Sequence, residues 1–272
     1  MSGRPIAMRA LRSMYLPRRC NRQMSSPLSA SVTFSPPVVE LEEYDIVPSQ
    51  MKEYMHLAAK ATPVRLSHLP LRLLSFPEAG GKLNVATHLY NYSGGHPERN
   101  RQRDELAADP TWTTEASAPG VIQGIRSTLF VEAPLVAKTE GVCGLSEMEL
   151  PLMQSDRGEK ACIYELRRYR LRLGYDTVPK FLKLYGEGLP SKLAAEGTDP
   201  TTSLTTVLYS EVGPLNEVIE LWRHGDGTAA MERSRVAARG ANQWRTAISQ
   251  IANLANEFTS TIHRPAPFSP WK

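Results

Sequence analysis

Cysteine, long apolar runs and familiar catalytic motifs are scarce or absent in this 272-residue sequence. Its three cysteines, Cys20, Cys143 and Cys162, lack CxxC spacing and have no histidines at the offsets of metal ligands. We therefore expect reduced thiols rather than a disulfide or a metal site. No segment approaches the roughly 20 consecutive apolar residues that span a bilayer, so no transmembrane segment is predicted.

The motif inventory excludes several classes of chemistry. The sequence contains no Walker loop, no GxGxxG after a strand, no GxSxG elbow, no HExxH and no EF-hand pattern. Phosphate, nucleotide, hydrolase and simple metal chemistry all lose support from this absence. An enzyme whose bound cofactor carries the reaction stays open, because such chemistry leaves no short motif of its own.

Acidic side chains are missing from the first 39 residues, since Glu40 is the first carboxylate of the chain. The same stretch holds six arginines and no lysine, and it can place five apolar side chains along one side of a short helix. Mitochondrial import receptors recognise this combination. We expect residues 1–37 to be a disordered mitochondrial targeting segment. A basic tail of a cytosolic protein and a chloroplast transit peptide are the alternatives.

The positive net charge comes from this leader. Without it, the chain has 26 basic and 28 acidic residues. The remainder therefore has no general electrostatic reason to bind nucleic acid, and no nucleic-acid partner is expected.

The body of the chain contains an internal repeat. Residues 39–46 match residues 164–171, at an offset of 125. Four later anchors share an offset of 132, and they are Leu83-Asn84 with Leu215-Asn216, His88-Leu89-Tyr90 with Glu220-Leu221-Trp222, Arg103 with Arg235, and Trp112 with Trp244. The seven extra residues of the second copy predict a longer loop, which the Gly- and Pro-containing stretch 185–200 favours.

Each copy shows the pattern β-α-β-β-α, then an irregular or helical stretch, then a last strand. The expected strands are 38–47, 71–76, 83–92 and 128–133 in the first copy, and 163–173, 204–212, 215–224 and 260–264 in the second. The second helix of each copy is expected at 97–108 and 228–239. Residues 241–258 predict an additional helix in the second copy, whereas residues 113–124 predict a shorter irregular segment in the first.

This order predicts an α+β fold of two tandem ferredoxin-like units, each an antiparallel sheet with helices on one face. Both faces of the first strand carry large side chains, Leu41 on one and Tyr44 and Ile46 on the other. Two sheets that face each other within one chain satisfy this pattern by enclosing a common core. The expected boundaries are a first unit at 38–134, a linker at 135–160 and a second unit at 161–272.

Together these segments resemble the NIPSNAP family. The resemblance rests on residues 164–169, the strand 215–224 with Arg235 and Trp244, and the corresponding segments of the first copy, including residues 88–92 and 106–112. It implies a dimeric α/β-barrel fold, here as an intramolecular dimer. It also implies residence in the mitochondrial matrix or at the inner membrane, and action through mitochondrial protein partners without an established reaction. At residues 239–242 the second copy departs from the first.

The candidate pocket residues are of two kinds. Some are carboxylates and tyrosines that recur on the first strand of both copies, and the others lie on the third strands. Glu40 and Tyr44, like Glu165 and Tyr169, share one strand face because side chains alternate along a strand. A buried carboxylate near tyrosine hydroxyls can orient a small ligand, and a structural hydrogen-bonded pair is the alternative. The full candidate set is Glu40, Tyr44, His88, Tyr92, Glu165, Tyr169 and His224, with no catalytic and no metal-binding residue among them.

The remaining polar and aromatic positions favour structural roles. His88 matches Glu220 rather than His224, so a symmetric pair of histidines is unsupported, although His88 alone can serve as a haem ligand or a base. Trp112, Trp222 and Trp244 are expected in the core, and the arginines of the second helices among acidic neighbours favour a solvated surface.

Two functions from different classes remain open. The first is a non-catalytic mitochondrial protein that acts through protein interactions in mitochondrial organisation or quality control, with no cofactor, and with further homo-oligomers allowed. The second is a small-molecule-binding or haem-binding monooxygenase-like enzyme, for which fold analogy is the only support.

Overall fold

The computed structural model describes residues 35–115, 119–142, 144–147 and 162–272, and these belong to one compact unit. The expected targeting segment lies almost entirely outside the described residues, as do Cys20 and Cys143 and much of the expected linker. Within the described part, Cys162 is a buried free thiol. None of the described helices is long and apolar enough to cross a membrane.

The first repeat is built from four strands and three helices. Its strands are β1 (Val38–Ile46), β2 (Leu71–Ala79), β3 (Val85–Tyr92) and β4 (Ile122–Glu132). A short 3-10 turn, η1 (Pro48–Gln50), leads into α1 (Met51–His68), and α2 (Gly95–Ala108) and α3 (Pro110–Glu115) follow β3. The segment between the repeats includes η2 (Val136–Lys138) and α4 (Gly144–Glu147).

The second repeat has the same order. Its strands are β5 (Ile163–Leu171), β6 (Thr202–Val212), β7 (Glu217–His224) and β8 (Ala255–Pro265). Its helices are α5 (Thr177–Leu193), α6 (Gly227–Gly240) and α7 (Asn242–Ala252). The predicted duplication is confirmed by register as well as by order, because Val38 pairs with Tyr92 in the first sheet as Ile163 pairs with His224 in the second.

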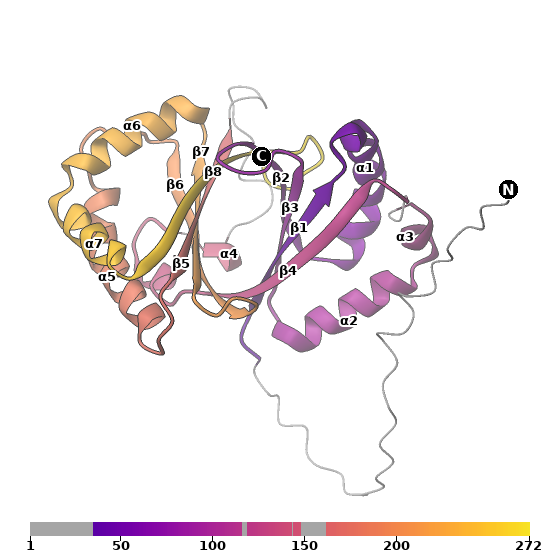
Figure 1. Cartoon of the computed structure of the whole chain (residues 1–272), viewed down its shortest axis with the longest axis horizontal. Coiled ribbons are helices and arrows are strands. Elements are labelled where there is room, and N and C mark those ends of the chain that lie inside the picture. Colours follow the sequence, from indigo (N-terminus) through magenta and orange to yellow (C-terminus); the bar gives the residue numbers. More distant parts are fainter. Residues whose placement is uncertain (1–34, 116–118, 143, 148–161) are drawn as a thin grey trace, which may run out of the picture. The chain divides into compact units, whose positions relative to one another are not determined.

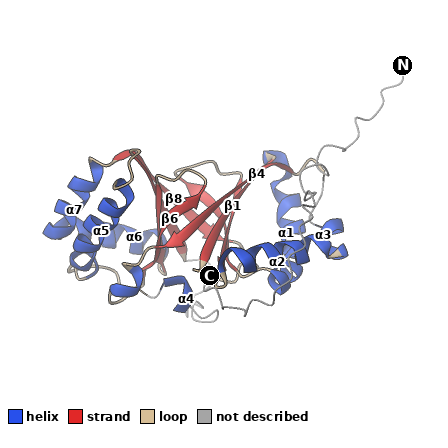
Figure 2. Ribbon diagram, turned by 90° about the horizontal axis from the view of Figure 1, so that it is seen from below, coloured by secondary structure: helices blue, strands red, loops and turns tan. Residues whose placement is uncertain are grey.

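The eight strands form one closed antiparallel ring in the order β1-β3-β2-β8-β5-β7-β6-β4. Each repeat contributes a four-stranded sheet, and the two sheets join where β4 pairs with β6 and where β2 pairs with β8. Figure 2 shows the strands lying between the helices α1 to α3 and the helices α5 to α7, and Figure 1 shows the same arrangement along the chain. Closure removes the free sheet edges that would otherwise invite pairing with other chains.

The interior of the ring is an apolar core. One face of each of the strands β1 to β7 supplies it, and its buried members include Leu41, Leu89, Leu166, Leu208 and Leu221. The C-terminal segment closes this core, because the fully buried Trp271 belongs to the same cluster and stacks on Tyr164 at 6.4 Å between ring centroids. The sequence alone did not decide whether the space between the two sheets is empty or filled. In the structure, apolar side chains fill it.

The longer loop of the second copy is confirmed, since residues 194–201 replace the two residues between α1 and β2 and lie almost entirely within the expected stretch 185–200. Two details of the prediction were wrong. The first is the start of this loop, because α5 continues through Gly186, Gly188 and Pro190. A side chain at Gly188 would place its Cβ 2.6 Å from the Cβ of Ala247, so this glycine allows the close approach of α5 and α7. Tertiary packing overrides the local preference of these residues to break a helix.

The last strand of each repeat also begins earlier than expected. Residues 241–258 form a helix only as far as Ala252, and β8 begins at Ala255. The stretch 258–263 is rich in β-branched residues, which favour a strand, and β5 lies beside it to pair with. In the first repeat, residues 110–115 form the short helix α3, which places Trp112 on a helix as Trp244 is on α7.

The ring core makes a direct prediction for stability. Leu221→Ala removes a side chain that is 3% exposed inside the ring, and we expect a loss of about 2–5 kcal/mol of unfolding free energy from lost burial and the resulting cavity. Leu173→Ala, at a position that is 86% exposed, is the control and should stay within about 0.5 kcal/mol of the unchanged protein. Urea denaturation measures both, and similar losses for the two variants would contradict this assignment of the core.

Candidate functional site

The candidate residues lie on the outer face of the ring, beneath the helices. Along β1, Val39 and Leu41 point into the core, whereas Glu40, Glu42 and Tyr44 alternate with them and point the other way. The same alternation holds in β5. The structure thus places the predicted carboxylates and tyrosines between sheet and helices, and not between the two sheets.

In the first repeat, Glu40 is fully buried and its carboxylate is saturated with donors. Arg99 of α2 donates from Nη2 at 2.5 Å and from Nε at 3.0 Å, and Arg103 donates from Nη2 at 2.7 Å. The hydroxyl groups of Ser127 and Tyr92 donate at 2.6 and 3.2 Å. Four side chains from α2, β3 and β4 therefore converge on one carboxylate of β1.

In the second repeat, Glu165 is held by equivalent groups. Arg235 of α6 donates from Nη2 at 2.5 Å and Ser260 of β8 donates at 2.6 Å, at the positions that match Arg103 and Ser127. Arg167 adds a two-pronged contact at 2.7 and 3.2 Å from the same strand. The predicted recurrence of the carboxylate extends to its partners, which the sequence analysis had assigned to a solvated surface.

These donors control the protonation of both carboxylates. Burial alone would raise the pKa of Glu165, but His224 and the guanidinium of Arg167 outweigh it and hold that pKa well below its usual range. The pKa of Glu40 is lowered in the same way, with Arg99 and Arg103 outweighing burial. Both groups are anions at neutral pH, and each fastens a helix to the sheet.

The two predicted tyrosines contact other carboxylates. The Tyr44 hydroxyl donates to Glu42 at 3.2 Å, while the Tyr169 hydroxyl donates to Glu220 on the neighbouring strand β7. Burial raises the pKa of Glu42, and Arg103 only partly opposes this. Neither tyrosine bonds the carboxylate four residues before it, so the predicted Glu and Tyr pairs share a face without forming a hydrogen bond.

His88 is enclosed in the first repeat. Its Nε2 lies 3.3 Å from the Tyr54 hydroxyl, its ring packs at 4.5 Å from Tyr44, and it is fully buried. Burial, with Arg65 and Arg103 nearby, holds the pKa of His88 well below its usual range. This enclosure does not fit haem ligation by His88, because a polar partner and aromatic rings already surround the imidazole.

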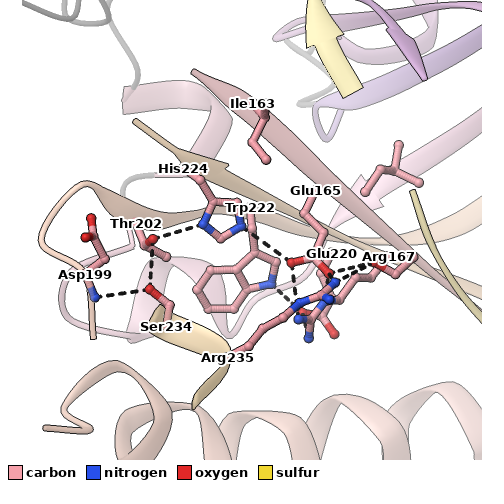
Figure 3. A network of polar contacts seen from close by, with 12 residues as sticks. Ile163, Glu165, Arg167, Asp199, Thr202, Glu220, Trp222, His224, Ser234 and Arg235 are labelled. Atoms are coloured by element: carbon pink, nitrogen blue, oxygen red, sulfur yellow. Dashed lines mark hydrogen bonds and ion pairs between the residues drawn. The ribbon is translucent and has the colours of Figure 1, made fainter. Parts of the chain in front are cut away.

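His224 belongs to a separate chain of contacts in the second repeat (Figure 3). Its Nδ1 lies 2.9 Å from the Thr202 hydroxyl, and its Nε2 faces Glu165 at 3.5 Å. The Ser234 hydroxyl donates to Thr202 at 2.9 Å and also accepts from the backbone N–H of Asp199 at 3.1 Å. This chain connects the inserted loop 194–201 to β6, α6 and Glu165.

A cavity of about 480 Å³ opens beside this chain, between the second sheet and its helices. Five basic side chains line it against the single carboxylate of Glu165, and they are Arg167, Lys192, Arg235, Arg239 and Arg245. Trp222 and Trp244 add apolar walls, and Thr198 of the inserted loop closes one side. Of the seven predicted residues, only Glu165 and His224 line this cavity.

Lys192 is the member of this wall that the sequence analysis missed. Its Nζ lies 3.7 Å from the ring centroid of Trp222 and 4.4 Å from that of Trp244. The signal is present in the helix, since Lys192 continues the buried stripe Phe181, Tyr185, Gly188 and Leu189. Arg65 ends the matching stripe of α1, and its guanidinium lies 5.0 Å from the ring centroid of Trp112.

One substitution distinguishes the two repeats at this point. Arg99, which holds Glu40, corresponds to Met231 at the shared offset of 132. Met231 lines the cavity of the second repeat and makes no polar contact with Glu165. The helix α2 therefore directs two guanidinium groups at Glu40, whereas α6 directs one at Glu165. Within the described residues, no group of three or more His, Cys, Asp or Glu side chains is arranged to hold a metal ion.

Solved structures with the same arrangement define the class of this fold. A putative monooxygenase from Lactobacillus acidophilus NCFM matches with a TM-score of 0.52 at 9% identity, over 85% of this chain and 95% of that one. A putative monooxygenase from Fusobacterium nucleatum matches with a TM-score of 0.56 at 8% identity, over 86% and 94% of the two chains. The protein is thus a tandem, single-chain α/β barrel of the dimeric type, and these identities establish the fold alone.

Sequence comparison identifies the family. The NIPSNAP family model matches residues 39–135 and 164–270, which together exceed half of the chain. This chain therefore belongs to the NIPSNAP family. It is 25% identical to Protein NipSnap homolog 3A of Homo sapiens over 275 residues, covering 99% of this chain and 98% of that protein. It is 24% identical to the human Protein NipSnap homolog 3B, covering 94% and 93%.

The lowered pKa of Glu165 makes stability depend on pH in a defined direction. A carboxylate whose pKa is lowered by folding contributes stability above its unfolded pKa, and this contribution is lost as the pH falls. We expect the unchanged protein to lose stability more steeply than Glu165→Gln between about pH 6 and about pH 3, so that their difference shrinks. Urea denaturation across this range tests the expectation.

Glu187→Gln is the matched control, because Glu187 is an exposed residue of α5 that lies 4.0 Å from Lys183. Its difference from the unchanged protein should vary little with pH, since exposed pairs contribute little. Parallel pH curves for the unchanged protein and Glu165→Gln would contradict the ionised, tightly held state of Glu165.

Proposed function

We propose that this protein binds a small organic anion in the cavity of its second repeat. The observation that carries the proposal is the composition of the cavity wall, in which four guanidinium groups and the amine of Lys192 face one carboxylate beside two indole rings. A volume of about 480 Å³ lies within the range of small-molecule sites. The hydrogen bonds around Glu165 and the chain of contacts from His224 to Asp199 hold the wall in place.

The residues of the cavity wall suit a ligand with two parts, one anionic and one apolar. Arg239 and Arg245 are exposed at the cavity and, among the described side chains, form no ion pair. Guanidinium groups suit carboxylate and phosphate, which they bind through paired hydrogen bonds. The indole rings of Trp222 and Trp244 make part of the wall apolar, which suits an apolar group of the ligand. A compact aromatic or unsaturated carboxylate satisfies both requirements.

Binding in the second repeat alone follows from the divergence of the copies. Copy one carries Arg99 where copy two carries Met231, and Ala107 where copy two carries Arg239. In the first copy, the guanidinium of Arg99 is bound to Glu40 and fills the space that Met231 leaves free in the second copy. Ala107 leaves the first copy without the cation that Arg239 provides in the second. Duplication thus supports one structural copy and one binding copy.

The proposal is tested by isothermal titration calorimetry with 2-naphthoate and its neutral analogue 2-naphthylmethanol. We expect the unchanged protein to bind 2-naphthoate at least about tenfold more tightly, because one or more guanidinium contacts are lost with the neutral group. Met231→Arg introduces the residue of the first copy and should weaken 2-naphthoate binding by at least about tenfold.

Val236→Arg is the matched control, since it adds the same charge to an exposed position of the same helix. It should leave the affinity unchanged within a factor of about two, because solvent screens a remote surface charge. Equal binding of the two naphthalene compounds, or equal effects of the two arginine substitutions, would overturn the proposal.

The localisation and partners are the second part of the proposal. The family resemblance favours a mitochondrial protein that acts on protein partners, in the matrix or at the inner membrane, and the acid-free arginine leader supports this localisation. The monooxygenase alternative has fold analogy as its support, and the enclosure of His88 argues against a haem held by that residue.

The targeting role of the leader is tested by fusing residues 1–37 to a fluorescent protein. We expect mitochondrial fluorescence from the fusion. Replacing all six arginines with alanine should abolish it, because import receptors and the membrane potential act on the positive charges. Confocal microscopy measures the outcome. Cytosolic fluorescence from the unmodified fusion would contradict a mitochondrial leader, and mitochondrial fluorescence from the alanine version would contradict the role of the charges.

A further inference from the structure

Lys192 is a buried amine with an unusual environment. Its side chain is 10% exposed, and among the described residues its Nζ has no hydrogen-bond partner. The nearest carboxylate oxygen, of Glu220, lies 4.0 Å away, and the two indole rings of the cavity wall pack on the ammonium group. Glu220 itself is occupied, since it accepts hydrogen bonds from Tyr185 at 2.8 Å and from Trp222 at 2.5 Å.

Four charged side chains act on Lys192, and they are Glu165 and Arg167 of β5, Glu220 of β7 and Arg235 of α6. Arg245 of α7 lines the same cavity. Burial and the positive charge of Arg167 lower the pKa of Lys192 to about 7, while Glu220 and Glu165 only partly oppose them. A large share of the amine is therefore unprotonated at neutral pH, whereas an ordinary lysine is almost fully protonated there.

A neutral amine in a cavity lined by guanidinium groups has a specific chemical use. Desolvated lysines react with carbonyl compounds, because the free amine is the nucleophile. The surrounding arginines attract a carboxylate and hold it near the cavity wall. An anion that also carries an aldehyde or ketone would bring its carbonyl carbon to the wall where Lys192 lies.

We propose that Lys192 forms a Schiff base with an aldehyde or 2-oxo acid bound in this cavity. The inference rests on the proposed function, since it needs small anions to enter the cavity. It goes further by naming the reactive group and the class of ligand. The geometry that supports it is the shared wall of Lys192, Trp222 and Trp244, with Arg167 and Arg235 beside it.

The step balances without any other reagent. The Lys192 nitrogen attacks the carbonyl carbon and opens the C=O double bond, which gives a carbinolamine after a proton moves from nitrogen to oxygen. Loss of the hydroxyl group as water then forms the C=N bond, and the second nitrogen-bound proton leaves with that water. Both protons pass from the nitrogen to the departing oxygen, so no side chain has to accept or supply one.

The first repeat cannot perform this step. Arg65 stands at the position of Lys192 on the matching helix stripe, and a guanidinium does not give up its proton in proteins. A buried basic side chain is kept at this position in both copies, whereas a nucleophilic amine is present in the second alone. This division agrees with the open cavity of the second repeat.

The test traps the Schiff base by reduction. The full chain is incubated with glyoxylate and sodium cyanoborohydride at neutral pH, which converts an imine into a stable carboxymethyl amine, and the modified residue is mapped by peptide mass spectrometry. We expect Lys192 to be modified at least about tenfold faster than Lys183, which lies exposed on the same helix, because its larger unprotonated share outweighs its reduced access.

The pH profile gives a second readout. Modification of Lys192 should rise up to about pH 7 to 8 and then level off, whereas modification of an ordinary lysine continues to rise towards about pH 10. Lys192→Arg keeps the cation over the indole rings and should abolish the fast adduct while the slow surface adducts remain. Equal rates for Lys192 and Lys183, or the same pH profile for both, would overturn the proposal.

Calorimetry with 2-naphthoate on the same preparation separates the two claims. If 2-naphthoate binds and no preferential adduct forms at Lys192, then the Schiff base is wrong and anion binding stands. If neither is observed, then the proposed function fails as well.

Discussion

A buried carboxylate that is held by arginine is the interaction on which the rest of this structure depends. Glu40 and Glu165 sit on the helix-facing side of the first strand of each repeat, with 0% and 1% exposure. Burying an unpaired carboxylate would cost several kcal/mol, so each of these positions requires donors from elsewhere in the fold. Arg103 and Arg235 meet this requirement from the second helices. The position of α2 and α6 over the sheet follows from it.

The same constraint explains how the cavity of the second repeat forms. A second arginine, Arg99, completes the donor set around Glu40 from α2. In the second repeat the additional guanidinium comes from Arg167 on the strand itself. Because that donor approaches along the sheet, α6 can carry Met231 and leave space above Glu165. The inserted loop 194–201 then walls the space and ties His224 to it through Thr202. Cavity, loop and arginine placement are parts of one arrangement.

The fold could be predicted from the sequence because its signals are local. Period-two alternation in residues 38–46 and 163–171 and the matching offsets revealed the repeat, and a sheet with two apolar faces implied a second sheet. The carboxylates and His224 could also be found by position. Their arginine partners could not, because Arg103 lies 63 residues from Glu40, and its acidic neighbours on α2 resemble an exposed surface. Lys192 carried a readable signal, since a cation on the apolar stripe of α5 must be buried, and the Gly and Pro residues around it concealed that the helix continues.

A double-mutant cycle between Glu165 and Arg235 tests the central claim most directly. The free energies of unfolding of the unchanged protein, Glu165→Gln, Arg235→Met and the double variant are measured by urea denaturation, because a single substitution also leaves its partner buried without a counter-charge. A buried carboxylate that fastens α6 to the sheet predicts a coupling energy of about 1–3 kcal/mol. Additive effects, with a coupling energy near zero, would show that the pair does not hold the helix in place and would contradict the account.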